Sequence, residues 1–262
     1  MQVKEIVAFL ENIAPLSLQE PYDNCGLITG SPNTDCTGVL CTLDATEAVI
    51  LEAVAKGCNV VVAHHPIVFS GLKKLSGSTY VEKALLTAIK HDIAIYAIHT
   101  NLDNIIGGVN GKIAQKIGLS QLEILDPKPG AGPGIGAGMI GQLSAPVTEA
   151  DFLQNLAHIF KIHTIKHSPF LGKKLQKIAI CGGSGAFLTQ KALEMGVDAF
   201  VTSDLKYHDY FDANDALLLV DIGHFESEQY TVELLVELLQ PKFPTFAVLK
   251  SDTKTNPVGY FM

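Results

Sequence analysis

Two adjacent histidines, His64 and His65, stand between an apolar run and Pro66, and imidazoles at such a place can bind a metal or move a proton. The run over residues 60–63 predicts a buried strand, and Pro66 cannot continue its hydrogen bonding, so the strand is expected to end near the histidines. Neighbouring side chains of a strand point to opposite faces. Both rings are therefore expected to face one metal centre, or one metal each of a pair, only if the backbone before Pro66 is irregular. Taken alone, the sequence His-His-Pro is equally compatible with a surface pair at the start of a loop.

Two later segments repeat this arrangement. A second apolar run is followed by His99 and Asp103, and a third by His224 and Glu228. His224 and Glu228 are four positions apart where a helix is expected to begin, so they share one face if the helix includes both. Open α/β sheets bind ligands at the carboxyl ends of their strands, which makes three such strand ends candidates for one site.

The donor types indicate the kind of site. Imidazole nitrogens and carboxylate oxygens without thiolate favour a catalytic or exchangeable divalent metal over a closed structural zinc. Five or six donors suit two metals bridged by a carboxylate, and Asp103 is the bridging candidate. His99 is interpreted as a residue behind the ligands, as a contact to substrate, or as an ordinary histidine at a strand end.

The elements that position these residues predict an α/β fold. Strand, helix and strand follow one another with short links over residues 39–63, which indicates a βαβ unit and a parallel sheet. A similar order recurs over residues 178–204, and aligning Gly57 with Gly196 suggests a distant internal duplication. We therefore expect two similar α/β domains with mainly parallel sheets flanked by helices.

A glycine- and proline-rich segment, residues 126–138, is interpreted as a linker or long turn. A phosphate-binding glycine loop is poorly supported because no Lys-Ser/Thr pair follows it. With the boundary placed there, the first domain is expected to comprise residues 1–126 plus 220–262, and the second residues 127–219. In the second half, Asp204, Lys206 and His208 follow a predicted strand; they are expected to line a pocket, or else to form a helix cap and a solvated face.

Composition limits the function classes. The chain has 262 residues, 47% of them hydrophobic, and a formal net charge of −8, which argues against a general binder of nucleic acid or of a membrane surface. Its five cysteines are odd in number and show no CxxC spacing, as expected for reduced core residues of a cytoplasmic protein. Residues 3–13 predict an amphipathic helix rather than a signal peptide, and no apolar stretch approaches the roughly 18 residues that span a bilayer.

Several segments occur in an order that resembles a known family, the dinuclear-metal proteins labelled "GTP cyclohydrolase 1 type 2 homolog", which are NGG-interacting-factor-like. The resemblance is carried by residues 23–27 (DNCGL), 64–73, 99–103, 203–208 (SDLKYH) and 223–228. It implies metal ligands at the following residues: His64, His65, Asp103, His224 and Glu228. Tyr22 stands where the family pattern has tryptophan, which puts no ligand in doubt. The chain resembles the short form, without the insertion found between the halves of longer members.

The resemblance also implies two divalent metal ions per chain, of unknown identity among Zn, Fe, Mn and Co, and a ring-shaped homohexamer with the metal sites facing an internal cavity. We expect a metal-dependent hydrolase acting on a small phosphorylated or nucleotide-like substrate, with His99 or His208 as the residue that moves the proton. The alternative is a non-catalytic metal-binding scaffold or metal-handling protein. Literal opening of the GTP ring ranks lowest.

Overall fold

The computed structural model describes residues 1–261, which form two compact units. The first unit contains residues 1–102 and the chain from residue 231 onward, and the second contains residues 103–230. The divisions thus fall after Leu102 and after Tyr230, whereas the sequence suggested divisions after residues 126 and 219.

The first unit is built on a five-stranded sheet of order β1-β4-β3-β2-β11. Strands β4, β3, β2 and β11 are parallel, and β1 is antiparallel at the edge. The strands are β1 (Gly26–Thr29), β2 (Val39–Asp44), β3 (Val60–His65), β4 (Ala94–Ala97) and β11 (Val248–Lys250). The helices are α1 (Val3–Ile13), η1 (Leu16–Leu18), α2 (Glu47–Ala55), α3 (Tyr80–Lys90), α4 (Thr100–Asp103, whose last residue begins the second unit) and α9 (Thr231–Lys242).

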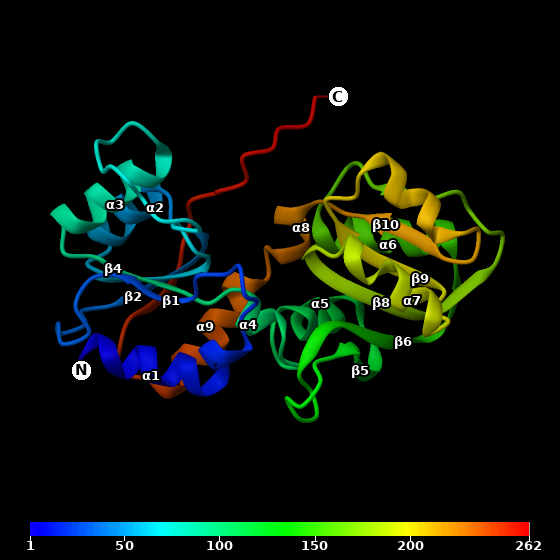
Figure 1. The fold of residues 1–262 in the computed structure, drawn as a ribbon, viewed down its shortest axis with the longest axis horizontal. Helices are drawn as coiled ribbons and strands as arrows, with labels where there is room; N and C mark the ends of the chain where they lie inside the picture. The colour runs from blue at the N-terminus through cyan, green and yellow to red at the C-terminus, as the bar shows by residue number, and fades with distance from the viewer. Residues whose placement is uncertain (262) are drawn as a thin grey trace. The chain divides into compact units, whose positions relative to one another are not determined.

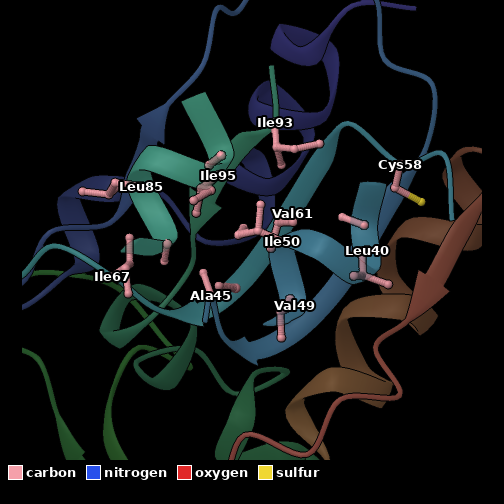
Figure 2. Close-up of a cluster of buried hydrophobic side chains, with 14 residues drawn as sticks. Leu40, Ala45, Val49, Ile50, Cys58, Val61, Ile67, Leu85, Ile93 and Ile95 are labelled. Carbon is pink, nitrogen blue, oxygen red and sulfur yellow. The ribbon is translucent and has the colours of Figure 1, made fainter. Parts of the chain in front are cut away.

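The core of the first unit lies between this sheet and the helices α2 and α3 (Figure 2). Leu40 and Val61 come from neighbouring parallel strands, and Val49 and Ile50 come from α2; all four are fully buried. This packing holds the strands in place on the face covered by α2 and α3. Polar side chains then follow at the carboxyl ends of the strands.

The second unit is built on a six-stranded sheet of order β5-β6-β8-β9-β10-β7, in which the central pairs β8–β9 and β9–β10 are parallel and the others antiparallel (Figure 1). The strands are β5 (Ser120–Pro127), β6 (Gly136–Thr148), β7 (Lys166–His167), β8 (Lys174–Ser184), β9 (Ala199–Ser203) and β10 (Leu218–Asp221). The helices are α5 (Val109–Ile117), α6 (Glu149–Phe160), η2 (Ala186–Leu188), α7 (Thr189–Glu194), η3 (Tyr207–Ala213) and α8 (His224–Glu228). The expected α/β class, with two sheets flanked by helices, is confirmed. The expectation of mainly parallel strands holds for the first sheet but not for the second, where β5–β6, β6–β8 and β7–β10 pair antiparallel.

The glycine-rich segment does not join the two units. It forms the turn between the antiparallel strands β5 and β6, inside the second unit, where Pro127 pairs with Gly136. Gly130, Gly132 and Gly134 have positive φ angles, a conformation that side chains disfavour, so the glycine content is explained by a tight hairpin.

Two further details differ from the sequence interpretation. The helix expected to begin near His224 is broken into α8 and α9, and the unit division at 230/231 falls between them. Strand β3 ends near the histidines, as expected, but both histidines belong to the regular strand and not to irregular backbone, because Asp44 of β2 still pairs with His65. Within residues 1–261, no helix is both long and apolar enough to cross a membrane, and all five cysteines are free thiols.

Candidate metal centre

Strand register brings three histidines of the first unit together. β3 and β4 are parallel with Ala63 opposite Ala97, so His64 and His65 at the end of β3 lie beside His99, which follows β4. The ring centroids of His64, His65 and His99 are 4.9, 5.1 and 5.3 Å apart in pairs. One nitrogen from each ring lies within 4.8 Å of the others, a spacing that fits ligands of one metal ion.

Each of these rings is held through its Nδ1 atom. His64 Nδ1 lies 2.8 Å from the Ile98 carbonyl oxygen, and His65 Nδ1 lies 2.9 Å from Asp44 Oδ1. A carbonyl or ionised carboxylate only accepts hydrogen bonds, so Nδ1 carries the proton and the lone pair is on Nε2. His64 Nδ1 is thus held by the residue that follows β4 and His65 Nδ1 by the last residue of β2, while the two ring centroids lie 4.9 Å apart.

His99 has a carboxylate partner as well. Its Nδ1 donates to Asp23 Oδ1 at 2.9 Å, and the other oxygen of Asp23 accepts from the Thr100 backbone N–H at 3.0 Å and from the Thr100 hydroxyl. Burial by itself raises the pKa of Asp23, but the hydrogen bonds from His99 and Thr100 outweigh it and hold that pKa well below its usual range. Asp23 is therefore a carboxylate that fixes the tautomer and the orientation of His99.

The second unit contributes a separate donor pair. Helix α8 begins at His224 and ends at Glu228, and His224 Nε2 lies 3.2 Å from Glu228 Oε2. His224 Nδ1 donates to Asp204 Oδ2 at 2.6 Å. Asp204 follows β9 and has a positive φ of 58°, an uncommon conformation that aims its carboxylate at the histidine. The expectation that His224 and Glu228 share one helix face is confirmed.

Glu228 is 3% exposed and packs against the glycines at the end of β8. A Cβ atom on Gly183, whose φ is +63°, would meet Glu228 Oε1 at 2.4 Å. The Gly183 carbonyl accepts hydrogen bonds from the hydroxyls of Thr202 and Ser203 at 3.1 and 2.5 Å, which fix this close approach. Glycine is therefore needed at position 183, because the buried Glu228 carboxylate occupies the space that a Cβ atom would take.

Asp103 lies at the end of α4, and its backbone carbonyl accepts from the Asn110 amide at 3.2 Å. Asn110 in turn accepts from the Gly182 N–H at 2.9 Å, which ties Asp103 to the end of β8. Burial, together with the charges of Asp103 and Glu228, raises the pKa of the Cys181 thiol well above its ordinary value. The charges of two predicted carboxylate ligands therefore both act on one buried thiol of the second unit.

His208 lies on the exposed helix η3, where its ring contacts Tyr207 and Phe211 at centroid distances of 5.1 and 6.2 Å. The same helix forms one wall of a pocket of about 500 Å³ lined by aromatic residues that include Tyr210. Neither His208 nor a predicted metal ligand lines this pocket. Of the two predicted catalytic histidines, His99 lies with His64 and His65 in the first unit. His208 belongs to η3 of the second unit.

Sequence reasoning missed the three carboxylates that orient the histidines: Asp23, Asp44 and Asp204. A signal for Asp44 was present, because it ends the strand beside β3 and so reaches the same sheet edge as His65.

The residues present fit a divalent metal. Imidazoles whose Nδ1–H is bound to a carboxylate or carbonyl are the usual form of metal-binding histidine, since the bond fixes the ring and makes Nε2 the donor. This pattern holds for His64, His65 and His99, and a carboxylate also holds the Nδ1 of His224.

Known proteins resemble this chain over most of its length. A protein of Lactococcus lactis named "GTP cyclohydrolase 1 type 2 homolog" is 34% identical over 258 residues, 98% of each chain. One of Clostridium acetobutylicum with the same name is 31% identical over 241 residues, 92% of this chain and 90% of its own. A Staphylococcus aureus relative, 26% identical, aligns over 367 residues and so carries additional segments.

Solved structures show the same fold. The crystal structure of a hypothetical protein of Staphylococcus aureus matches with a TM-score of 0.93 and 29% identity, covering 100% of this chain and 99% of that one. A Bacillus cereus protein related to NIF3 matches with a TM-score of 0.92 and 25% identity over the same shares. The family model described as Duf34/NIF3 (NGG1p interacting factor 3) matches residues 1–257. The chain belongs to the Duf34/NIF3 family.

Proposed function

We propose that this protein binds two divalent metal ions per chain. The proposed ligands are the five residues named by the sequence: His64, His65, Asp103, His224 and Glu228. The observation that carries the proposal is a set of imidazoles whose Nδ1 atoms are held by Ile98, Asp44 and Asp204. Nε2 of each ring is then left with the lone pair that can bind a metal. Asp103 and Glu228 supply the anionic oxygens that complete a nitrogen and oxygen donor set.

We further propose that the site hydrolyses a small substrate. Bound divalent metals would supply Lewis acidity and lower the pKa of water toward neutrality. The spacing of His99 to His64 and His65 would also suit a metal ligand, but we propose that His99 stays off the metal. It would then hold or move the proton at Nε2, because Asp23 keeps its Nδ1 protonated. Phe69 packs edge-to-face on His99 at a centroid distance of 5.7 Å, which limits the positions open to that ring.

A phosphorylated or nucleotide-like substrate is the proposed class. The name of these relatives, "GTP cyclohydrolase 1 type 2 homolog", refers to a nucleotide. In the first unit, the exposed Lys73 and Lys74 follow the His-His-Pro sequence and provide positive charge for a phosphate in an otherwise acidic protein. The homohexamer implied by the family resemblance stays a prediction, which light scattering of the purified protein tests.

The first experiment measures metal content per chain on protein purified without a metal-affinity tag. We expect about two metals in the wild type, by the ligand count that a dinuclear site requires, and a loss of metal in Asp103→Ala. Asp126→Ala is the matched control, because Asp126 is an exposed aspartate of β5 in the same unit. Absence of metal from the wild type even after refilling with zinc, iron or manganese would refute the site.

The second candidate function is a metal-binding protein without turnover. It is favoured by the same donors, since nothing in a ligand set requires catalysis. His99→Ala separates the two: an enzyme loses hydrolysis of phosphoesters and retains its metal, whereas a metal-handling protein shows fast metal exchange and no hydrolysis in either form.

A further inference from the structure

The chain that follows β11 runs beside the end of β2. We call residues 251–255 the C-terminal segment; it has no regular secondary structure. The Ser251 N–H donates to the Cys41 carbonyl of β2 at 2.9 Å, which continues the parallel pairing of β11 with β2. The segment therefore follows β2 toward the strand end where Asp44 is located.

Glu52 of α2 holds the middle of this segment. Its carboxylate accepts from the hydroxyls of Ser251 and Thr253, both at 2.6 Å, and from the Asp252 N–H at 2.8 Å. Lys56, one turn further along α2, contacts both Glu52 and Asp252 at 2.7 Å. These contacts define the path of the segment up to Thr255.

Thr255 then reaches the carboxylate that orients a proposed metal ligand. Its hydroxyl donates to Asp44 Oδ2 at 2.6 Å, while Asp44 Oδ1 accepts from His65 Nδ1 at 2.9 Å. The two oxygens of one carboxylate are thus held by two partners 190 positions apart in the chain. Rotation of the Asp44 carboxylate would break one bond or the other.

We propose that Thr255 is a positioning residue of the metal centre: its hydroxyl fixes the Asp44 carboxylate, which fixes the tautomer and direction of His65. This inference rests on the proposed function for its metal-binding consequence, but the positioning of His65 is a property of the metal-free protein as well. The C-terminal segment is then part of the site although it contributes no metal ligand.

Thr255 can act on His65 because of the geometry of the Asp44 carboxylate between them. A hydroxyl on Oδ2 restricts the side-chain torsion of Asp44 and keeps Oδ1 directed at His65, and the charge-assisted bond at Oδ1 holds the proton on Nδ1. Without the hydroxyl the carboxylate can turn, and His65 can adopt the other tautomer, with its proton on the nitrogen that would bind metal. Loss of partners that orient metal ligands typically weakens metal binding by about 10–100-fold.

The test compares four proteins: wild type, Thr255→Val, Thr255→Ser and Thr253→Val. Valine keeps the shape of threonine without the donor, and serine keeps the donor. Thr253→Val is the matched control, since it removes a contact between the C-terminal segment and Glu52 and leaves Thr255 and Asp44 unaltered. Each protein is titrated with Zn²⁺ against a chromogenic chelator, and the His65 ring is observed by ¹⁵N NMR in metal-free protein above the ordinary pKa of imidazole.

For Thr255→Val we expect Zn²⁺ affinity to fall by about tenfold, the low end of the range for such partners, and the His65 signal to change from the Nδ1–H form to a mixture. Thr255→Ser and Thr253→Val should keep the wild-type tautomer and affinity. The proposal would be overturned if Thr255→Val kept the wild-type Zn²⁺ affinity and His65 tautomer. It would also be overturned if Thr253→Val lost as much Zn²⁺ affinity as Thr255→Val, because the effect would then come from general loosening of the C-terminal segment. A wild type that binds no Zn²⁺ would instead refute the proposed function, and the NMR comparison would still decide the role of Thr255.

Discussion

Asp23 and His99 are 76 positions apart in the chain, yet the His99 Nδ1–H donates to Asp23 Oδ1 at 2.9 Å. The contact arises because β1, which follows Asp23, pairs antiparallel with β4, which precedes His99. The same carboxylate accepts from the Thr100 backbone, so one side chain fixes both the ring and the start of α4. A local turn in the sequence is thus part of the candidate metal centre.

Asp23→Asn tests this relationship. Asparagine keeps the size of aspartate, but it replaces one acceptor oxygen by a donor and removes the charge, so the bonds from His99 and Thr100 cannot all be retained. We expect the free energy of unfolding in urea at neutral pH to fall by about 1.5–3 kcal/mol, the range for hydrogen bonds to charged groups.

The control for Asp23→Asn is Asp35→Asn, at an exposed aspartate of the same unit. Its free energy of unfolding should stay within about 0.5 kcal/mol of the wild type, as for ordinary surface substitutions. Equal stabilities of the two variants would contradict a structural role for the Asp23 carboxylate.

Gly183→Ala tests the room made for Glu228. The added Cβ would meet Glu228 Oε1 at 2.4 Å, so the buried carboxylate must move. Gly196→Ala is a matched control, since Gly196 has a similar φ of +58° with nothing within 4 Å of the added Cβ. Both variants should lose about 1–2 kcal/mol from the left-handed backbone conformation, and only Gly183→Ala should also lose bound metal. Retention of metal in Gly183→Ala would show that the position of Glu228 is not required.

His99→Ala and His208→Ala separate the two predicted catalytic histidines. His99 lies with His64 and His65, whereas His208 lies on the exposed helix η3. In an assay of phosphoester hydrolysis we expect His99→Ala to lose the activity, by about 100-fold or more as for a general acid or base. His208→Ala should change the free energy of unfolding by less than about 0.5 kcal/mol. Loss of hydrolysis in His208→Ala, with full activity in His99→Ala, would reverse the assignment.

Much of the fold could be predicted because it depends on local patterns. The apolar spacing of residues 3–13 corresponds to α1, and the Val39 and Val60 strands with α2 between them form the predicted βαβ unit. Residues 126–138 form the long turn that was one of their two interpretations. A domain boundary was also placed there, because glycines that satisfy positive φ angles have the composition of a linker.

Of the candidate site, only the residues that could donate to a metal were predictable from the sequence. Histidines and carboxylates at strand ends are visible in a sequence, and the parallel register of β3 and β4 places His64 and His65 beside His99. The partner of His99 was not visible, because Asp23 reaches that ring through the antiparallel pairing of β1 with β4. Asp44 could have been found, since it ends the strand that the predicted βαβ unit places beside β3. Tautomer and ring direction are therefore properties of the tertiary structure, and only the chemistry of the donors is local.

The lowered pKa of Glu52 predicts that the contacts of the C-terminal segment depend on pH. Partial burial by itself raises the pKa of Glu52, but hydrogen bonds from Lys56, Ser251 and Thr253 outweigh it and lower the pKa from 4.5 to about 2. A carboxyl whose pKa is lower in the folded state contributes stability above its unfolded pKa and loses that contribution as the pH falls through the folded pKa. The contacts of the segment should therefore weaken as the pH is lowered from about 4.5 to about 2.

The measurement is the difference in free energy of unfolding between the wild type and Glu52→Gln as a function of pH. At neutral pH the variant should be less stable by about 1.5–3 kcal/mol, because glutamine cannot replace the charged acceptor. The difference should shrink toward zero as Glu52 becomes protonated in the wild type. Glu47→Gln, at the exposed start of the same helix, should show a smaller difference at neutral pH. A difference for Glu52→Gln that is constant down to pH 2 would mean that the charge of Glu52 does not hold the segment in place.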